Sequence, residues 1–360
     1  MSERPNIVLI TADQWRADTL GLLQNQHPLL TPHLDQLSDE GVRFSNAWAD
    51  CPICMPQRAT LLTGLTGSTL GVTTNFHDRT PVESKTSLPA LLRKRGDYQC
   101  ACIGKTHVIP ERGRFGFDEV VLHPDDYVNF LEDRGFGGLY RGHGVGGNEV
   151  VPAPNPLPET LTSSHWITDR AIEFMYRRDP EHPFFLWIIY EAPHPPFDPP
   201  EAYQRLYSRQ PIPGTTPSPW AESEEPRAFT RRRLMHNWDR LSPEWINETR
   251  RFYYAQQTFI DYQLGRLFGE LKSRDLWDDT AVMFHSDHGS PAAAEGALVA
   301  TENPPRMARR RSAVIVWLPL CRVIIRIFAT TTTAGASRPT SCFLPRCAFM
   351  AEPPQASLPR

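Results

Sequence analysis

The sequence lacks the features that mark membrane proteins, nucleic-acid-binding proteins and disulfide-rich secreted proteins. Its longest apolar run near the C-terminus, residues 312–320, is followed by Arg322 and is too short to span a bilayer. The formal charge is −3 and no basic stripe exceeds a few residues, which argues against a nucleic-acid partner. The seven cysteines are odd in number and unevenly spaced, which is not the pattern of a disulfide framework.

The N-terminus also lacks a charged segment followed by a long apolar segment, the pattern of a secretory signal peptide. We therefore expect a cytoplasmic protein that has neither a membrane nor a nucleic acid as its partner. The 360 residues are enough to bury a sizeable core in one large domain or two medium ones.

The last part of the chain lacks several residue types altogether. Residues 290–360 contain no lysine, aspartate, histidine or tyrosine, and they hold nine arginines against three glutamates. Thr330 to Thr333 is a homopolymeric tract, and no helix or strand can be placed after about Leu320. We therefore divide the chain into a regular domain, residues 1–289, and an atypical C-terminal segment, residues 290–360. A shifted reading frame or a truncated gene product would explain this segment.

The regular part alternates strands with helices, which predicts an α/β fold with a mainly parallel central sheet flanked by helices. Continuous apolar runs predict strands at residues 6–11, 98–103, 183–190 and 280–284. Helices are predicted from Pro32 to a stop at Gly41, at 88–94, at 164–177 and from Ser242 onward. Two segments rich in proline, glycine or charge, residues 125–158 and 208–234, are expected to be irregular surface insertions.

The most informative motif is Cys54-Met-Pro56-Gln-Arg58, followed after four residues by Thr63-Gly64. Pro56 suits the first turn of a helix and Gly64 suits its C-terminal cap. Cys54 should then lie at the helix N-terminus, where free N–H groups favour anions. A nucleophile at this position would meet an anionic ester. Two other interpretations remain, a buried structural thiol and a Cys51/Cys54 redox pair.

Chemically active residues follow each of the four predicted strands. The first strand leads to Asp13, Gln14 and Arg16, the second to Lys105 and His107, the third to His194, and the fourth to Asp287 and His288. Ligands of open α/β sheets bind beyond the carboxyl ends of the strands, so these residues should share one edge of the sheet. His285 and His77 are taken to be structural.

The residue types at this edge suit an anion and a metal ion. Oxygen ligands from Asp13, Asp287 and the amide of Gln14 favour a hard divalent cation, with Ca²⁺, Mg²⁺ and Mn²⁺ all suitable. Arg58, Lys105 and His107 would add cationic donors to an anionic group whose charge grows in the transition state.

The Cys54 motif resembles the signature of the type I, formylglycine-dependent sulfatases of the alkaline phosphatase superfamily. The resemblance implies that a formylglycine-generating maturation enzyme oxidises Cys54 to formylglycine. One hydroxyl of the formylglycine hydrate would attack sulfur, and the other would expel sulfate by re-forming the aldehyde. A serine would instead be left as a stable sulfate ester. The resemblance also makes Ca²⁺ the leading choice of metal.

The resemblance extends to further residues, one strand end at a time. It implies metal binding by Asp13, Gln14, Cys54, Asp287 and His288, although the family often has a second aspartate in place of Gln14. His288 is either a metal ligand or a donor to the sulfate. The resemblance implies catalytic roles for Cys54, Arg58, Lys105, His107 and His194, and substrate binding by Asn75, Lys105 and His194.

The resemblance covers residues 5 to 289. The family usually continues with a further active-site lysine and a small C-terminal subdomain, and the absence of lysine after Lys272 indicates that this subdomain is missing or altered. The predicted reaction is hydrolysis of a small sulfate monoester. The alternatives are a phosphonate monoester or phosphodiester hydrolase of the same superfamily and an inactive truncated remnant.

Overall fold

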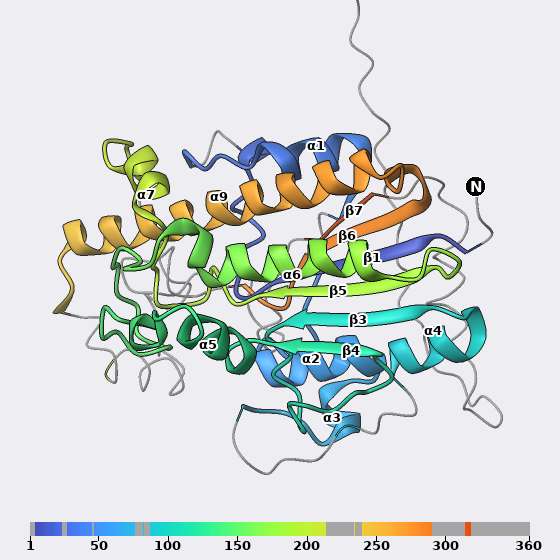
Figure 1. Cartoon of the computed structure of the whole chain (residues 1–360). Helices are drawn as coiled ribbons and strands as arrows, with labels where there is room; N and C mark the ends of the chain where they lie inside the picture. Colours follow the sequence, from blue (N-terminus) through green and yellow to red (C-terminus); the bar gives the residue numbers. More distant parts are fainter. Residues whose placement is uncertain are drawn as a thin grey trace, which may run out of the picture.

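The computed structural model describes residues 4–23, 27–44, 47–75, 82, 87–213, 234, 240–289 and 314–317. Its centre is a seven-stranded sheet in the order β2-β7-β6-β1-β5-β3-β4 (Figure 1). The strands are β1 Asn6–Ala12, β2 Val42–Phe44, β3 Gln99–Gly104, β4 Glu119–Leu122, β5 Phe184–Tyr190, β6 Thr280–Ser286 and β7 Val314–Trp317.

Five neighbouring strands, β6, β1, β5, β3 and β4, pair in parallel, and β7 runs antiparallel to both β6 and β2. The prediction of an α/β fold with a mainly parallel sheet is therefore confirmed. The four strands predicted from the sequence, β1, β3, β5 and β6, lie side by side in the middle of this sheet. Their carboxyl ends consequently meet at one edge.

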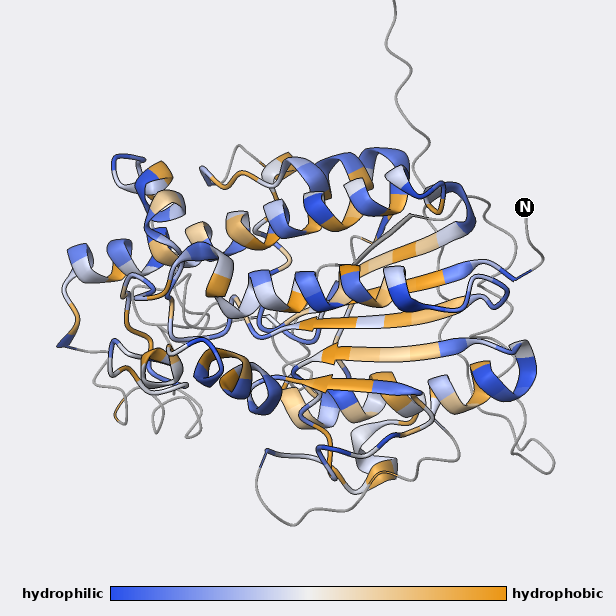
Figure 2. Ribbon diagram, in the orientation of Figure 1, coloured by the Kyte–Doolittle hydropathy of each residue, from blue (hydrophilic) through white to orange (hydrophobic). Residues whose placement is uncertain are grey.

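The helices cover both faces of the sheet. Their bounds are α1 Pro32–Glu40, α2 Cys54–Thr63, α3 Gly67–Leu70, α4 Leu88–Gly96, α5 Asp125–Glu132, α6 Ser163–Arg177, α7 Glu201–Tyr207 and α9 Pro243–Ser273. Helices α1, α6 and α9 pack on one face, and α2 and α4 pack on the other. Figure 2 shows the apolar strands between helices whose outward sides are hydrophilic.

Alternation along β5 supplies apolar side chains to both layers. Phe184 and Leu186 pack with the core under α1, α6 and α9, whereas Phe185 and Trp187 pack with the core under α2 and α4. Successive residues of a strand point to opposite faces, and all seven residues of β5 are buried. This explains why a strand in the middle of a parallel sheet is an unbroken apolar run.

Two local features fix the backbone at the end of α2 and directly after β1. At the end of α2, Gly64 adopts a left-handed conformation with a φ of 73°, and its N–H donates to the carbonyl of Thr60. After β1, Gln14 has a φ of 65°. The hydroxyl of Tyr253 on α9 donates to the carbonyl of Gln14 and accepts from the N–H of Arg16. The chain leaving β1 is thus fixed to the long helix.

The sequence missed the strands β2, β4 and β7 and the helices α3, α5 and α7. β2 and β4 have three and four residues, too few to show a pattern, and β7 lies in the apolar run at 312–320. The prediction of an irregular segment over 125–158 was wrong for α5, in which Tyr127 and Leu131 are buried one turn apart. The glycine-rich part begins only at Gly135.

Most of residues 208–234 and 290–360, and also His77, lie outside the described residues, so those predictions are not compared with the structure. In the part of the chain that the structure describes, no helix combines the length and the apolar character needed to cross a bilayer.

Candidate active site

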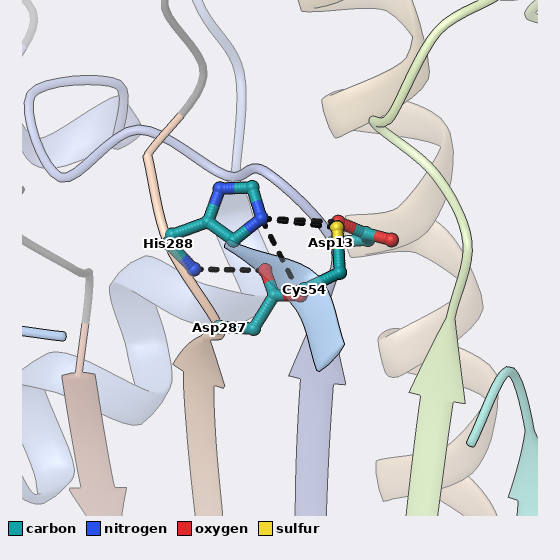
Figure 3. Close-up of side chains that lie close together, drawn as sticks. All are labelled: Asp13, Cys54, Asp287 and His288. Atoms are coloured by element: carbon teal, nitrogen blue, oxygen red, sulfur yellow. Dashed lines mark hydrogen bonds and ion pairs between the residues drawn. The ribbon is translucent and has the colours of Figure 1, made fainter. Parts of the chain in front are cut away.

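Four buried side chains from three elements meet at the carboxyl edge of the sheet. Asp13 follows β1, Asp287 and His288 follow β6, and Cys54 is the first residue of α2 (Figure 3). One potential ligand atom from each lies within 4.8 Å of the others. The Cys54 Sγ is 3.2 Å from His288 Nε2 and 3.7 Å from Asp13 Oδ1. The sequence analysis proposed all four as metal ligands.

Arg58 joins the two carboxylates of this cluster. It lies one turn after Cys54 on α2, and its side chain is 0% exposed. Its Nη2 is 3.0 Å from Asp13 Oδ2 and 3.0 Å from Asp287 Oδ2, and its Nε donates to the same Asp287 oxygen over 3.1 Å. A third contact goes from Nη1 to the carbonyl of Lys105. Arg58 therefore ties α2 to the ends of β1, β3 and β6.

The two carboxylates have opposite pKa shifts. Burial raises the pKa of Asp13, but Lys105 and Arg58 outweigh it and hold this pKa well below its usual range. Burial also raises the pKa of Asp287, and the neighbouring Asp13 raises it further. The carboxylate of Asp287 is therefore not fully compensated by the cations around it, and an additional cation at this position would stabilise it.

The donor atoms fit a hard divalent cation on chemical grounds. Two buried carboxylates and an imidazole converge at this point. The raised pKa of Asp287 means that its ionised form is destabilised here, and a bound cation would offset this. Gln14 approaches through its backbone, because its N–H donates to Asp287 Oδ1 over 3.0 Å. The role of the Gln14 amide as a ligand stays a prediction.

Cys54 is surrounded by imidazoles. Burial and the Asp13 carboxylate raise the pKa of the Cys54 thiol. The imidazoles of His288, His107 and His194 outweigh both effects, so this pKa lies well below its usual range. Burial lowers the pKa of His288, yet Asp287 and Cys54 raise it to about 9. The surroundings of Cys54 therefore favour a negatively charged group at this position.

Lys105 extends the cationic environment away from the metal ligands. Its Nζ donates to Asp13 Oδ2 over 2.8 Å and lies 3.6 Å from Glu191 Oε1. Burial lowers the pKa of Lys105, but Asp13 and Glu191 raise it above its ordinary value, so the amine is charged. The ring of His194 is oriented by a 2.7 Å hydrogen bond between Nδ1 and the carbonyl of Pro195.

Asn75 and His285 have clear structural contacts. The side-chain oxygen of Asn75 accepts from the N–H of Met55 over 3.0 Å, and it thereby caps the first turn of α2 beside Cys54. His285 shares a 2.8 Å hydrogen bond with the hydroxyl of Thr11, and burial lowers its pKa to about 4. A neutral, hydrogen-bonded His285 agrees with the structural role expected for it.

Two further residues that are not among the predicted site residues lie next to this site. Glu191 directly follows β5 and contacts Lys105, and His123 directly follows β4 with its Nε2 3.6 Å from Glu191 Oε2. His123 escaped notice because β4 was not recognised as a strand. Its position immediately after the run Val120-Val121-Leu122 is the signal that the other strand ends also carry.

Comparison with known proteins agrees with this geometry. The family model described as "Sulfatase" matches residues 5–310. An arylsulfatase of Clostridium perfringens is 32% identical over 79% of this chain and 63% of its own length. The multifunctional alkaline phosphatase superfamily protein PehA of Trinickia caryophylli is 31% identical over the same shares of both chains. The chain thus spans 63% of the length of both curated relatives.

Solved structures share the fold. The phosphonate monoester hydrolase of Agrobacterium radiobacter superposes with a TM-score of 0.70 at 24% identity, covering 88% of this chain and 68% of the other. A YidJ sulfatase of Bacteroides fragilis, described as putative, superposes with a TM-score of 0.60 at 23% identity, covering 89% and 69%.

Proposed function

The chain belongs to the sulfatase family, and from this membership we propose that it hydrolyses a sulfate monoester to an alcohol and sulfate. One observation supports this most strongly. Cys54 lies at the N-terminus of a helix, in a buried cluster that combines two carboxylates with several cationic side chains. Such a cluster suits a tetrahedral anion held against a nucleophile.

Cys54 is proposed to act after oxidation to formylglycine by a maturation enzyme that supplies the oxidant. One hydroxyl of the formylglycine hydrate attacks sulfur, and the S–O bond to the alcohol breaks. The second hydroxyl then loses its proton, the aldehyde re-forms, and sulfate departs. The residue is thereby restored for the next cycle.

The other side chains hold and neutralise the sulfate. Arg58 and Lys105 would offset the negative charge that grows on the sulfate oxygens, and His107 would add a donor from the β3 side. His194 lies between the cluster and a neighbouring cavity, where it is suited to hydrogen-bond the leaving oxygen. Asn75 would support the site by fixing the first turn of α2.

Asp13, Asp287, His288 and the Cys54 side chain would hold a divalent cation, with Gln14 as a further ligand and Ca²⁺ as the first choice. A bound cation would polarise an ester oxygen and favour ionisation of the hydrate.

The experiment that tests the proposal begins with the mass of the proteolytic peptide that contains Cys54, from protein produced in its native host. We expect the mass of the aldehyde, together with turnover of an aryl sulfate in the presence of Ca²⁺. An unmodified thiol and no turnover would contradict the proposal and favour an inactive remnant.

The second candidate function is hydrolysis of a phosphonate monoester or a phosphodiester. It is favoured by the 31% identity to PehA, whose name calls it multifunctional, and by the fold shared with a phosphonate monoester hydrolase. Gln14, next to the metal-site Asp13, is consistent with it. A kcat/KM that is much larger for an aryl phosphonate than for the matching aryl sulfate would establish this second function.

A further inference from the structure

The side chains of Arg58, Lys105 and His288 are here called the cationic cluster. A cavity opens beside it, on the side of β5 and β4. It encloses about 430 Å³, counted with the part that is open to solvent, and His194 and Glu191 belong to its wall. Tyr127 of α5, residues of the segment 139–163 and Gln256 of α9 also line it. Because Lys105 contacts both Asp13 and Glu191, the cavity begins where the cationic cluster ends.

Some buried polar atoms of the residues that line this cavity lack a hydrogen-bond partner. His123 Nδ1 and the side-chain oxygen of Gln256 have no hydrogen-bond partner among the residues that the structure describes, and His123 Nε2 has only the Glu191 carboxylate, 3.6 Å away. His123 is 4% exposed and Gln256 is 2% exposed. A buried polar atom without a partner destabilises the fold, so several in one cavity indicate a place that a polar ligand completes.

The chemistry of the wall favours hydroxyl groups. Burial lowers the pKa of His123 although Glu191 opposes the shift, so the ring is neutral and offers one donor and one acceptor. A hydroxyl group, itself both donor and acceptor, matches such a ring. His123 stacks on Tyr127 at 5.3 Å and meets the edge of Tyr140 at 6.3 Å, which gives the cavity a rigid aromatic side.

The charges of the wall disfavour a second anion. Glu191 and Asp198 bring two carboxylates to the cavity, and Arg141 brings one guanidinium. The guanidinium is already engaged, with its Nη2 3.2 Å from Glu191 Oε1. Asp198 accepts from Gln256 over 3.0 Å and from Asn155 over 3.1 Å. An alcohol that carried its own carboxylate or a second sulfate would meet these two carboxylates, while the nearby cations, Arg141 and Lys105, are already engaged by Glu191.

We propose that this cavity is the subsite for the organic half of the ester, and that it selects an alcohol bearing several neighbouring hydroxyl groups. His123, Gln256 and Asp198 bind those hydroxyls. The proposal rests on the proposed function for the sulfate that the alcohol carries, but the cavity itself can be tested without any hydrolysis.

The first test compares two primary alkyl sulfates of similar ring size, D-glucose 6-sulfate and cyclohexylmethyl sulfate, which differ in their ring hydroxyls. We expect kcat/KM to be at least about tenfold larger for D-glucose 6-sulfate, because each unpaired polar group in the cavity penalises the apolar ring. Equal kcat/KM values for the two sulfates, or a higher kcat/KM for a ring that also carries a carboxylate, would overturn the proposal.

The variant His123→Phe keeps an aromatic ring but removes both nitrogens. It should lower kcat/KM for D-glucose 6-sulfate about tenfold and leave that for cyclohexylmethyl sulfate within about twofold. His182→Phe makes the same change at the opposite edge of the sheet, immediately before β5, and should change neither value. An equal loss on both sulfates would overturn the proposal, and Asp198→Asn repeats the test if His123→Phe fails to fold.

Calorimetry separates this proposal from the proposed function. Methyl glucoside, added without any sulfate ester, should bind to the unchanged protein. It should not bind to the variant His123→Phe, whose melting temperature must equal that of the unchanged protein. If no sulfate ester is hydrolysed but methyl glucoside binds in this way, the proposed function fails and the subsite stands. If aryl sulfate is hydrolysed and methyl glucoside does not bind, the subsite fails and the function stands.

Discussion

Arg58 illustrates how one buried residue can decide whether the site forms. Its guanidinium contacts both buried carboxylates, and these carboxylates would otherwise repel each other across the edge of the sheet. Even with Arg58 in place, Asp287 retains a raised pKa. The Arg58 guanidinium and the His288 imidazole are therefore insufficient compensation for Asp287, which predicts that a divalent cation stabilises the whole chain.

The first prediction concerns that cation. Adding Ca²⁺ at about 100 times its dissociation constant should raise the free energy of unfolding by about 2.7 kcal/mol, measured as a shift in melting temperature at pH 7.5. Asp287→Asn should abolish the shift because it removes one carboxylate ligand. Asp261→Asn changes another buried aspartate, on α9, and should keep it. A shift that persists in Asp287→Asn would show that the ion binds elsewhere.

The second prediction separates a nucleophile from a redox pair at Cys51 and Cys54. Both are free thiols, and only Cys54 belongs to the buried cluster. Cys54→Ala should lower the turnover of an aryl sulfate about 10³-fold or more, because the attacking group is lost. Cys51→Ala should stay within about threefold of the unchanged protein. Comparable losses in both variants would favour the redox interpretation.

At the scale of residues, the sequence predicted the site residues that directly follow a long apolar strand. Asp13, Lys105, His194 and Asp287 follow long apolar runs, and the structure brings their strand ends to one edge. Their catalytic and ligand roles stay predictions. Glu191 and His123 also directly follow strands, but β4 is too short to show a recognisable pattern, and the contacts of both residues come from across the fold.

At the scale of elements, α1 is held by a residue of α9 in place of a cap of its own. Thr31 precedes α1 without a side-chain cap, and the first turn begins with Pro32. Asp261 on α9 supplies the acceptors: its Oδ2 accepts from His33 N over 3.1 Å and its Oδ1 from Leu34 N over 2.8 Å. The carboxylate thus joins two helices of the same layer.

The third prediction is the pH dependence of this contact. Burial raises the pKa of Asp261 from 3.8 to about 7, and Asp35 adds to the shift while the two N–H groups oppose it. Between those values the folded chain keeps a proton that the unfolded chain has released. Stability should therefore fall as the pH rises from 4 to 7, by up to about 4 kcal/mol, and change little from this group above pH 7.

Urea unfolding of the unchanged protein and of Asp261→Asn, measured from pH 4 to pH 8, isolates this group. The difference between their free energies of unfolding should change over pH 4 to 7, because asparagine cannot ionise. A difference that is constant over the whole range would contradict the assigned shift.

The strength of the local pattern decided which elements were predictable. The stripe of Ile260, Leu264, Leu267 and Leu271 marked α9 because it repeats over three turns, and all four residues are buried. β4 and β7 have only four residues each, and they are held in the sheet by pairing with β3 and β6. Short strands of this kind are fixed by partners and not by their own sequence.

At the scale of the whole molecule, β7 joins the edge strand β2 to the rest of the sheet. Val316 is opposite Met283 of β6 on one side and Val42 of β2 on the other. Each strand pair depends on backbone hydrogen bonds, and β7 has a neighbour on both sides. A break in β7 therefore separates β2 from β6 and exposes a sheet edge, which favours aggregation.

The fourth prediction follows from this position. Val316→Pro removes a backbone N–H from a strand paired on both sides and should destabilise the protein by about 3 kcal/mol or more, with increased light scattering on heating. Val316→Ala keeps the N–H and is the matched control, which should melt at a clearly higher temperature than Val316→Pro. Equal melting temperatures for the two variants would show that the pairing contributes little.

The order of strands also separates two regions of the molecule, the cluster around Cys54 and the cavity. The groups around Cys54 come from β1, α2 and β6, whereas the cavity wall comes from the ends of β4 and β5 and from the segment 139–163. Lys105 and Glu191 form the border between them. Gene libraries that randomise the segment 139–163 would thus vary the leaving group that is accepted while the residues around Cys54 stay unchanged. Under selection, the range of substrates can therefore change faster than the reaction itself.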